Sequence, residues 1–91
     1  MEFTRHAEGR IRQRGISQEV LDVIMEFGQL DYTNGATLLH MNKRSISNYL
    51  KYSDVPNYQI TSKLKKTYLV ECQGKVLTAA HKRRSWRRKF K

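Results

Sequence analysis

Residues 3–17 read FTRHAEGRIRQRGIS, and this stretch decides how the chain begins to fold. Thr4 is of a type that caps the first turn of a helix, because its side-chain oxygen accepts from an unpaired backbone N–H. Gly15 readily takes the left-handed conformation that ends a helix. The stretch therefore predicts a short helix over residues 5–14, followed at once by the start of a second helix.

One face of this predicted helix is basic. Residues four apart lie on the same face of a helix, so His6, Arg10 and Arg14 form a polar stripe. An adjacent apolar stripe consists of Phe3, Ala7 and Ile11. A side chain that can transfer a proton and two fixed positive charges are thus expected to point the same way. A purely structural alternative is that the arginines form ion pairs with Glu8 or Asp22, since guanidinium suits carboxylate and phosphate equally well.

This stretch resembles the N-terminal motif H-A-x-x-R-x-x-x-R-G-I-S of a bacterial family catalogued as domain of unknown function 4258. The matching residues are His6, Ala7, Arg10, Arg14, Gly15, Ile16 and Ser17. That family is grouped by fold with the barnase/colicin/RelE-like ribonucleases and toxins, so the resemblance implies a RelE-like fold without establishing an activity. It returns at residues 67–72 and 76–81, where Thr78 matches a recurring threonine that either binds phosphate or is an ordinary strand residue.

The rest of the chain predicts helices and strands in alternation. Apolar residues at helical spacing follow Ser17 until Gly28, which predicts the second helix. The pair Asn34-Gly35 predicts a hairpin turn between residues 31–33 and 36–41. Asn42 is expected to cap a short helix that ends by Tyr52.

The last third of the chain predicts a second hairpin. Residues 57–62 are polar without a clear period, which is typical of a loop or a short edge strand. Residues 65–72 and 75–81 flank Gln73-Gly74 and are rich in β-branched and aliphatic side chains. The predicted fold is α+β, a small antiparallel sheet with two N-terminal helices packed on it.

Charge divides the chain into two parts. The 91 residues contain 18 Lys and Arg against 8 Asp and Glu, a net charge of +10. Residues 81–91 read HKRRSWRRKFK and contain no acidic residue. We therefore expect one RelE-like domain over residues 1–81 and a basic tail over residues 82–91. The residues expected to bind nucleic acid are Arg14, Arg83, Arg84, Trp86, Arg87, Arg88 and Lys89.

The basic tail indicates RNA as a partner. Crowded cations are stabilised when they neutralise phosphates, and an aromatic ring such as Trp86 can stack on an exposed base of a single strand. Two alternatives stay open. Trp86 can instead anchor the tail on the domain, and the tail can instead bind an acidic protein that acts as an antitoxin. Both ribosomal and messenger RNA are candidate targets.

The histidines suggest cleavage of RNA without a metal. Such cleavage needs a group that takes the 2′-hydroxyl proton, a group that protonates the leaving oxygen, and cations for the phosphate. His6 and His81 are the candidate proton-transfer pair, and Arg10 and Lys82 are the candidate phosphate stabilisers. The structural alternative is a surface or capping role for His6 and a half-buried strand end for His81.

No other chemistry is indicated. The single cysteine, Cys72, excludes an intramolecular disulfide, and no His/Cys spacing suits a metal, so no cofactor is expected. No apolar run approaches the length of a membrane span, which predicts a cytoplasmic protein. The sequence thus favours an RNA-binding, toxin-like protein with metal-independent endoribonuclease activity. The alternative is a non-catalytic regulatory protein that binds nucleic acid.

Overall fold

The computed structural model describes residues 2–82, which form a five-stranded mixed sheet and four α-helices. The strands are β1 (Glu2–Phe3), β2 (Gln29–Thr33), β3 (Ala36–His40), β4 (Thr67–Cys72) and β5 (Lys75–His81). The helices are α1 (Arg5–Arg14), α2 (Gln18–Phe27), α3 (Lys43–Tyr52) and α4 (Thr61–Lys66), and a 3-10 turn precedes α4 at Tyr58–Ile60. The predicted α+β class is confirmed.

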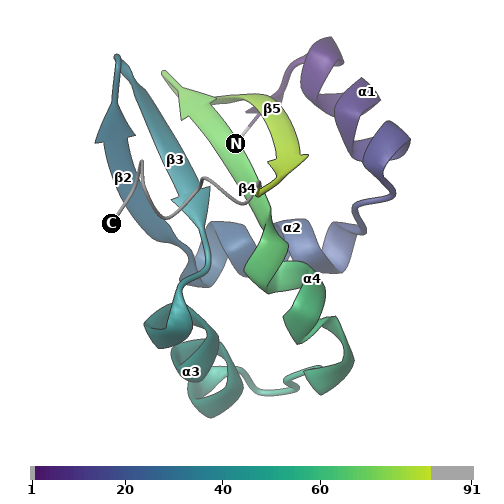
Figure 1. The fold of residues 1–91 in the computed structure, drawn as a ribbon, viewed down its shortest axis with the longest axis vertical. Helices are drawn as coiled ribbons and strands as arrows, with labels where there is room; N and C mark the ends of the chain where they lie inside the picture. The colour runs from purple at the N-terminus through teal and green to yellow at the C-terminus, as the bar shows by residue number, and fades with distance from the viewer. Residues whose placement is uncertain (1, 83–91) are drawn as a thin grey trace.

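The strands lie in the order β1-β5-β4-β3-β2. Figure 1 shows α1 alongside β5, while the other helices gather at the lower end of the sheet. The edge strands of the sheet are β1 and β2. Here α1 packs against β5 and α2 against β3, and α3 and α4 both contact α2. The sequence predicted three helices, two of them N-terminal, whereas the described residues contain four α-helices.

The helix predicted over residues 5–14 is confirmed, including both of its caps. The Thr4 hydroxyl accepts from the Ala7 N–H at 3.1 Å. Gly15 takes the left-handed conformation with φ 65°, and its N–H donates to the Arg12 carbonyl at 3.2 Å. The Thr4 hydroxyl also donates to the Leu77 carbonyl at 3.2 Å, which fixes the start of α1 beside β5.

Both predicted hairpins form. Asn34 and Gly35 have positive φ angles of 48° and 78°, and Gln73 and Gly74 have 51° and 82°. Two successive positive φ values are the geometry of the two-residue turns that match the twist of paired strands. The predicted helix capped by Asn42 is also confirmed, since the Asn42 side chain accepts from the Ser45 N–H at 2.8 Å.

The prediction of a purely antiparallel sheet is wrong at one edge. Strand β1 pairs in parallel with β5, with Glu2 opposite Lys75 and Phe3 opposite Val76. Two residues are too few to produce the alternating pattern by which a strand is recognised. The strand is instead set by tertiary contact, because the Thr4 N–H donates to the Val76 carbonyl at 3.0 Å.

The prediction of loop or edge strand for residues 57–62 is also wrong. The chain forms the 3-10 turn and then α4, so the strand that was expected from residue 65 begins at Thr67. Helix α4 has only six residues, too few to show a helical spacing of apolar residues, and no side chain caps its start. It therefore lacks both of the sequence signals by which a helix is recognised. Ile60 and Leu64, 8% and 0% exposed, hold this segment on the core.

The core lies between the sheet and the helices. Leu39, Leu69 and Ala79 occupy one row across β3, β4 and β5, and each is at most 2% exposed. The buried residues of α2 are Val20, Leu21, Val23 and Ile24. The second predicted helix therefore buries its apolar face, as its spacing indicated.

Gly28 ends α2 for a reason that the sequence did not predict. Its φ is −65°, outside the left-handed region that favours glycine. A Cβ at this position would lie 2.3 Å from the Ile24 carbonyl oxygen, which is backbone and cannot easily move away. Glycine is required at position 28 because a side chain would clash with the backbone, and not because the backbone angle φ demands it.

We expect Gly28→Ala to destabilise the fold by about 1–3 kcal/mol, the usual cost of forcing an added methyl group into packed structure. Gly9→Ala is the matched control, because nothing lies within 4 Å of a Cβ at Gly9, inside α1. That change should stabilise by about 0.5–1 kcal/mol, since glycine weakens a helix interior. Urea denaturation followed by circular dichroism measures both. Equal stability of the two variants would contradict the close approach at Gly28.

Candidate functional site

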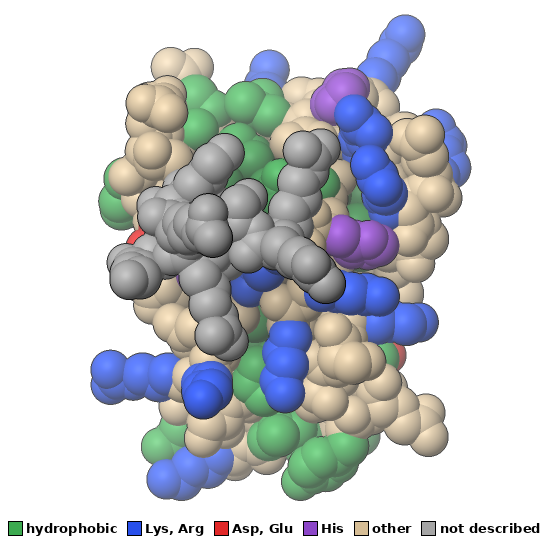
Figure 2. Space-filling view, in the orientation of Figure 1, with side chains coloured by type: hydrophobic (Ala, Val, Ile, Leu, Met, Phe, Trp, Pro, Cys, Tyr) green, Lys and Arg blue, Asp and Glu red, His purple; other side chains and the backbone are tan. Residues whose placement is uncertain are grey.

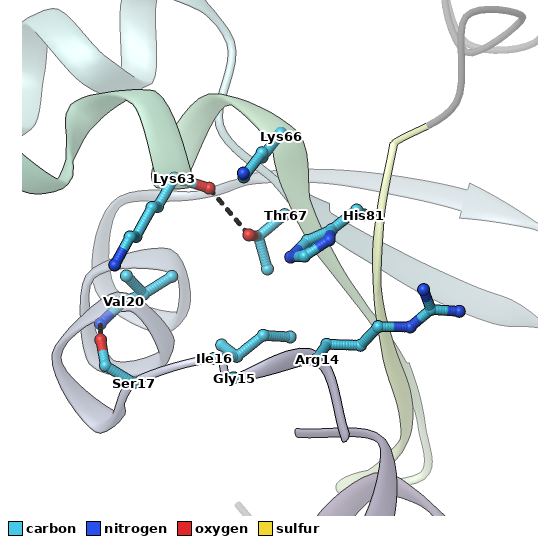
Figure 3. A pocket seen from close by; sticks show the side chains of 9 residues that line it. All are labelled: Arg14, Gly15, Ile16, Ser17, Val20, Lys63, Lys66, Thr67 and His81. Carbon is cyan, nitrogen blue, oxygen red and sulfur yellow. Dashed lines mark hydrogen bonds between the residues drawn. The ribbon is translucent and has the colours of Figure 1, made fainter. Parts of the chain in front are cut away.

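A small pocket lies where the end of α1, the start of α2, the end of α4 and the end of β5 meet (Figure 3). Its volume is about 60 Å³. The residues that line it are Arg14, Gly15, Ile16, Ser17, Val20, Lys63, Lys66, Thr67 and His81. Three of these are fixed cations, one is a histidine, and no carboxylate is among them.

The turn between α1 and α2 forms one wall of the pocket. Left-handed Gly15 ends α1, and the Ile16 N–H donates back to the Ile11 carbonyl at 3.0 Å. Ser17 then caps α2, with its hydroxyl accepting from the Val20 N–H at 3.2 Å. Because both caps fix the turn, Arg14 ends up next to the first turn of α2.

The opposite wall comes from α4, β4 and β5. Thr67 lies directly across from His81 in the β4–β5 ladder. The Thr67 hydroxyl donates to the Lys63 carbonyl at 2.7 Å, and the Lys82 N–H donates to the Lys66 carbonyl. These bonds join the last turn of α4 to the end of β5, so the side chain of His81 lies beside that of Lys66.

The side chains differ in how they face the pocket. In Figure 3, Lys66 comes from the last turn of α4 and His81 from the end of β5, on the same side of the pocket. Lys63 extends from α4 toward Val20, on the other side. The guanidinium of Arg14 extends past His81, away from the centre of the pocket. Lys66 and His81 therefore lie together, with Lys63 and Arg14 at two other places along the lining.

The cations act on the protonation of His81. Burial lowers the pKa of His81 below its usual 6.5, and the positive charges of Lys66 and Arg14 lower it further. The ring is therefore neutral at pH 7, with one nitrogen able to accept a proton. On the surface drawn in Figure 2, Lys and Arg side chains stand beside histidines and little acidic surface is visible.

The pocket brings together Arg14 and His81 but does not include His6 or Arg10. His6 is exposed in the first turn of α1, and eight residues at 1.5 Å each place it about 12 Å along the helix axis from Arg14. The Arg10 Nη1 donates to the Gln13 side chain at 3.4 Å. The only ion pair between residues 2 and 82 joins Asp31 and His40, so no carboxylate there holds Arg10 or Arg14.

Lys82 faces away from the pocket. Its Nζ donates to the Met41 carbonyl at 3.0 Å, and burial lowers its pKa. The tail residues Arg83, Arg84, Trp86, Arg87, Arg88 and Lys89 lie outside the described residues, so their predicted roles stay predictions. The same holds for the domain boundary expected near residue 82.

The third histidine, His40, has a carboxylate partner in the structure. Its Nε2 bonds the Asp31 side chain on the neighbouring strand β2. Within residues 2–82, no group of three His, Cys, Asp or Glu side chains is placed to hold a metal ion. No helix in that range is long and apolar enough to cross a membrane.

Lys63 and Lys66 are the pocket residues that the sequence did not single out. Both lie in α4, which was predicted as a loop running into a strand. Their spacing of three residues is the one signal that was available, since residues i and i+3 share a helix face. It becomes informative only once residues 61–66 are known to be helical.

Comparison with known proteins adds no relative. Protein-family models, curated proteins and solved structures were all searched, and none matches this chain. The resemblance to domain of unknown function 4258 therefore stays a prediction from the N-terminal motif, and the argument for function depends on the pocket itself.

We expect Lys66→Met to raise the pKa of His81 part of the way toward 6.5. The substitution removes one of the two cations that disfavour the protonated ring, while burial and Arg14 remain. An NMR titration of the His81 ring proton measures this shift. Lys65→Met is the control, because Lys65 is a neighbouring exposed lysine of α4 that does not line the pocket. An unchanged pKa in Lys66→Met would contradict the described proximity.

Proposed function

We propose that this chain is an RNA-binding protein that holds an RNA phosphate in the pocket formed by α1, α4 and β5. The observation that carries the proposal is a pocket lined by Arg14, Lys63 and Lys66 together with His81, with no carboxylate among the lining residues. Cations that are not paired with acids are available to neutralise phosphate, and their counterions are released when they do so.

RNA is favoured over other anions by charge and by the sequence resemblance. The chain has a net charge of +10, and its last residues combine cations with Trp86 and Phe90, the composition of a segment that stacks on single-stranded bases. The resemblance to a family grouped with RelE-like toxins adds a toxin-like role and a RelE-like fold to the proposal. A cytoplasmic protein of this kind is typically neutralised by an acidic antitoxin, which would compete for the same basic surface.

A second candidate function is cleavage of RNA without a metal. It is favoured by one observation, the lowered pKa of His81, which leaves a neutral imidazole beside cations at pH 7. Such a ring can accept the proton of a 2′-hydroxyl as that oxygen attacks phosphorus, while Lys66 and Arg14 stabilise the charge that develops on the phosphate. The 5′-oxygen then leaves and takes a proton from water, giving a 2′,3′-cyclic phosphate and a 5′-hydroxyl, and His81 gives its proton to the hydroxide that remains.

For RNA binding, we expect Lys66→Met to weaken the affinity for single-stranded RNA about tenfold and to reduce the slope of log affinity against log salt by about 0.7, the effect of losing one phosphate contact. Fluorescence anisotropy at several salt concentrations measures both quantities. Lys65→Met has the same change in net charge outside the pocket, so it should have a smaller effect. Equal loss in the two variants would show that binding depends on net charge and not on the pocket.

For cleavage, we expect incubation with total RNA in EDTA to produce new 5′ ends that His81→Ala reduces by about 10²–10⁴-fold, the usual contribution of a general base. Affinity for RNA should change little in that variant, which separates proton transfer from binding. Tight binding by the unaltered protein without any new 5′ ends would favour the non-catalytic regulatory protein.

A further inference from the structure

We propose that the pocket recognises the terminal phosphate of an RNA chain, a phosphomonoester, in preference to an internal phosphodiester. This inference rests on the proposed RNA-binding function and specifies its substrate; it does not rest on the cleavage candidate, which needs an internal phosphodiester in the pocket. Three properties of the pocket support it: its charge, its closed inner wall and the arrangement of its donors.

The charge of the pocket matches a phosphomonoester better than a phosphodiester. A terminal phosphate carries a charge of about −1.5 to −2 at pH 7 and presents three strong acceptor oxygens. An internal phosphodiester carries one negative charge and two such oxygens. Arg14, Lys63 and Lys66 supply three fixed positive charges, and His81 can supply a fourth. A single negative charge would leave most of this positive charge uncompensated.

The inner wall of the pocket belongs to the core. Ile16, Val20 and Thr67 line it and are 9%, 1% and 1% exposed. Because the hydroxyl of Thr67 already donates to the Lys63 carbonyl, this wall is closed by packed and hydrogen-bonded groups. An internal phosphate has the chain continuing from two of its oxygens and needs a path on both sides. A terminal phosphate needs a path for the chain on one side only. The pocket, with a volume of about 60 Å³, is open to a phosphate that enters at the end of an RNA chain.

The donors lie on different sides of the pocket. Lys66 from α4 and His81 from β5 lie on one side, and Lys63 extends along the other side toward Val20 (Figure 3). Donors on more than one side suit the three oxygens of a terminal phosphate, which point in different directions. Donors for an extended backbone would instead follow one another along a groove.

Proton uptake by His81 would accompany binding of the dianion. The charged groups that face His81 are Lys66 from α4 and Arg14 from α1, and both disfavour the imidazolium. A phosphate dianion between them reverses the sign of the local field and raises the pKa of the ring. The ring can then donate a hydrogen bond to a phosphate oxygen, so binding and protonation reinforce each other.

The test uses one single-stranded RNA octamer of fixed sequence in three forms: with a 5′-phosphate, with a 3′-phosphate, and with hydroxyl groups at both ends. Affinities for the full-length protein are measured by competition against a labelled RNA at constant salt. We expect one of the phosphorylated forms to bind about tenfold more tightly than the form without phosphate, and the form that does so identifies the end. Lys66→Met should remove this preference, while Lys65→Met should keep it.

Two outcomes would overturn the inference in different ways. Equal affinity for all three octamers, lowered equally by Lys66→Met, would mean that the pocket holds an internal phosphodiester, and the proposed RNA-binding function would stand. Inorganic phosphate that competes as well as the phosphorylated octamer would mean that the ligand is free phosphate. Failure of every octamer to bind would reject the RNA-binding function. In that case, inorganic phosphate that shifts the His81 ring resonance would still support a phosphate pocket, and an unshifted resonance would reject it.

Discussion

The antiparallel pairing of β4 with β5 is the constraint on which both the core and the pocket depend. Within the ladder it places Leu69 opposite Ala79, both fully buried. At its end it places Thr67 opposite His81, and the Lys82 N–H extends the pairing to the Lys66 carbonyl in α4. The chain therefore cannot form its central strands in register without also bringing His81 to the last turn of α4.

The pocket has an electrostatic cost that the rest of the fold must offset. Arg14, Lys63 and Lys66 all line this small pocket, no carboxylate is among the lining residues, and like charges repel. The lowered pKa of His81 is a sign of this field. Since the unfolded chain binds that proton more readily than the folded one, this group makes the fold less stable as the pH falls through 6.5 and below. Such a concentration of cations is expected at a site that binds anions, and it has no evident role in folding.

The sequence predicted the elements whose ends are marked by local chemistry. Thr4, Ser17 and Asn42 act as caps as expected, and Asn34-Gly35 forms the hairpin turn, because each of these residues interacts with backbone only a few positions away. The sequence did not predict β1 or α4. Both are short, and each is held by residues distant in the chain, β1 by Val76 and α4 by the core around Leu64.

The candidate site could be predicted only in part, because its residues come from elements that are distant in the chain. Arg14 was predicted to bind nucleic acid together with the basic tail, and His81 was predicted to act with His6, Arg10 and Lys82. The structure pairs them with Lys63 and Lys66, because β5 ends where α4 ends. Lys82 follows His81 directly in the sequence, but its Nζ donates to the Met41 carbonyl and it does not line the pocket.

The position of α1 relates the remaining basic residues to the pocket. The helix starts beside Leu77 through Thr4 and ends at the pocket with Arg14, so it runs along β5 in the same direction as the strand. Arg10 then lies one helical turn, about 6 Å, from Arg14 and farther from the pocket. Arg14 and Arg10 thus form a line of cations that leads from the pocket along α1. An RNA chain whose terminal phosphate lies in the pocket leaves it in one direction, and α1 offers cations along one such path. An internal phosphate would have RNA leaving the pocket in two directions.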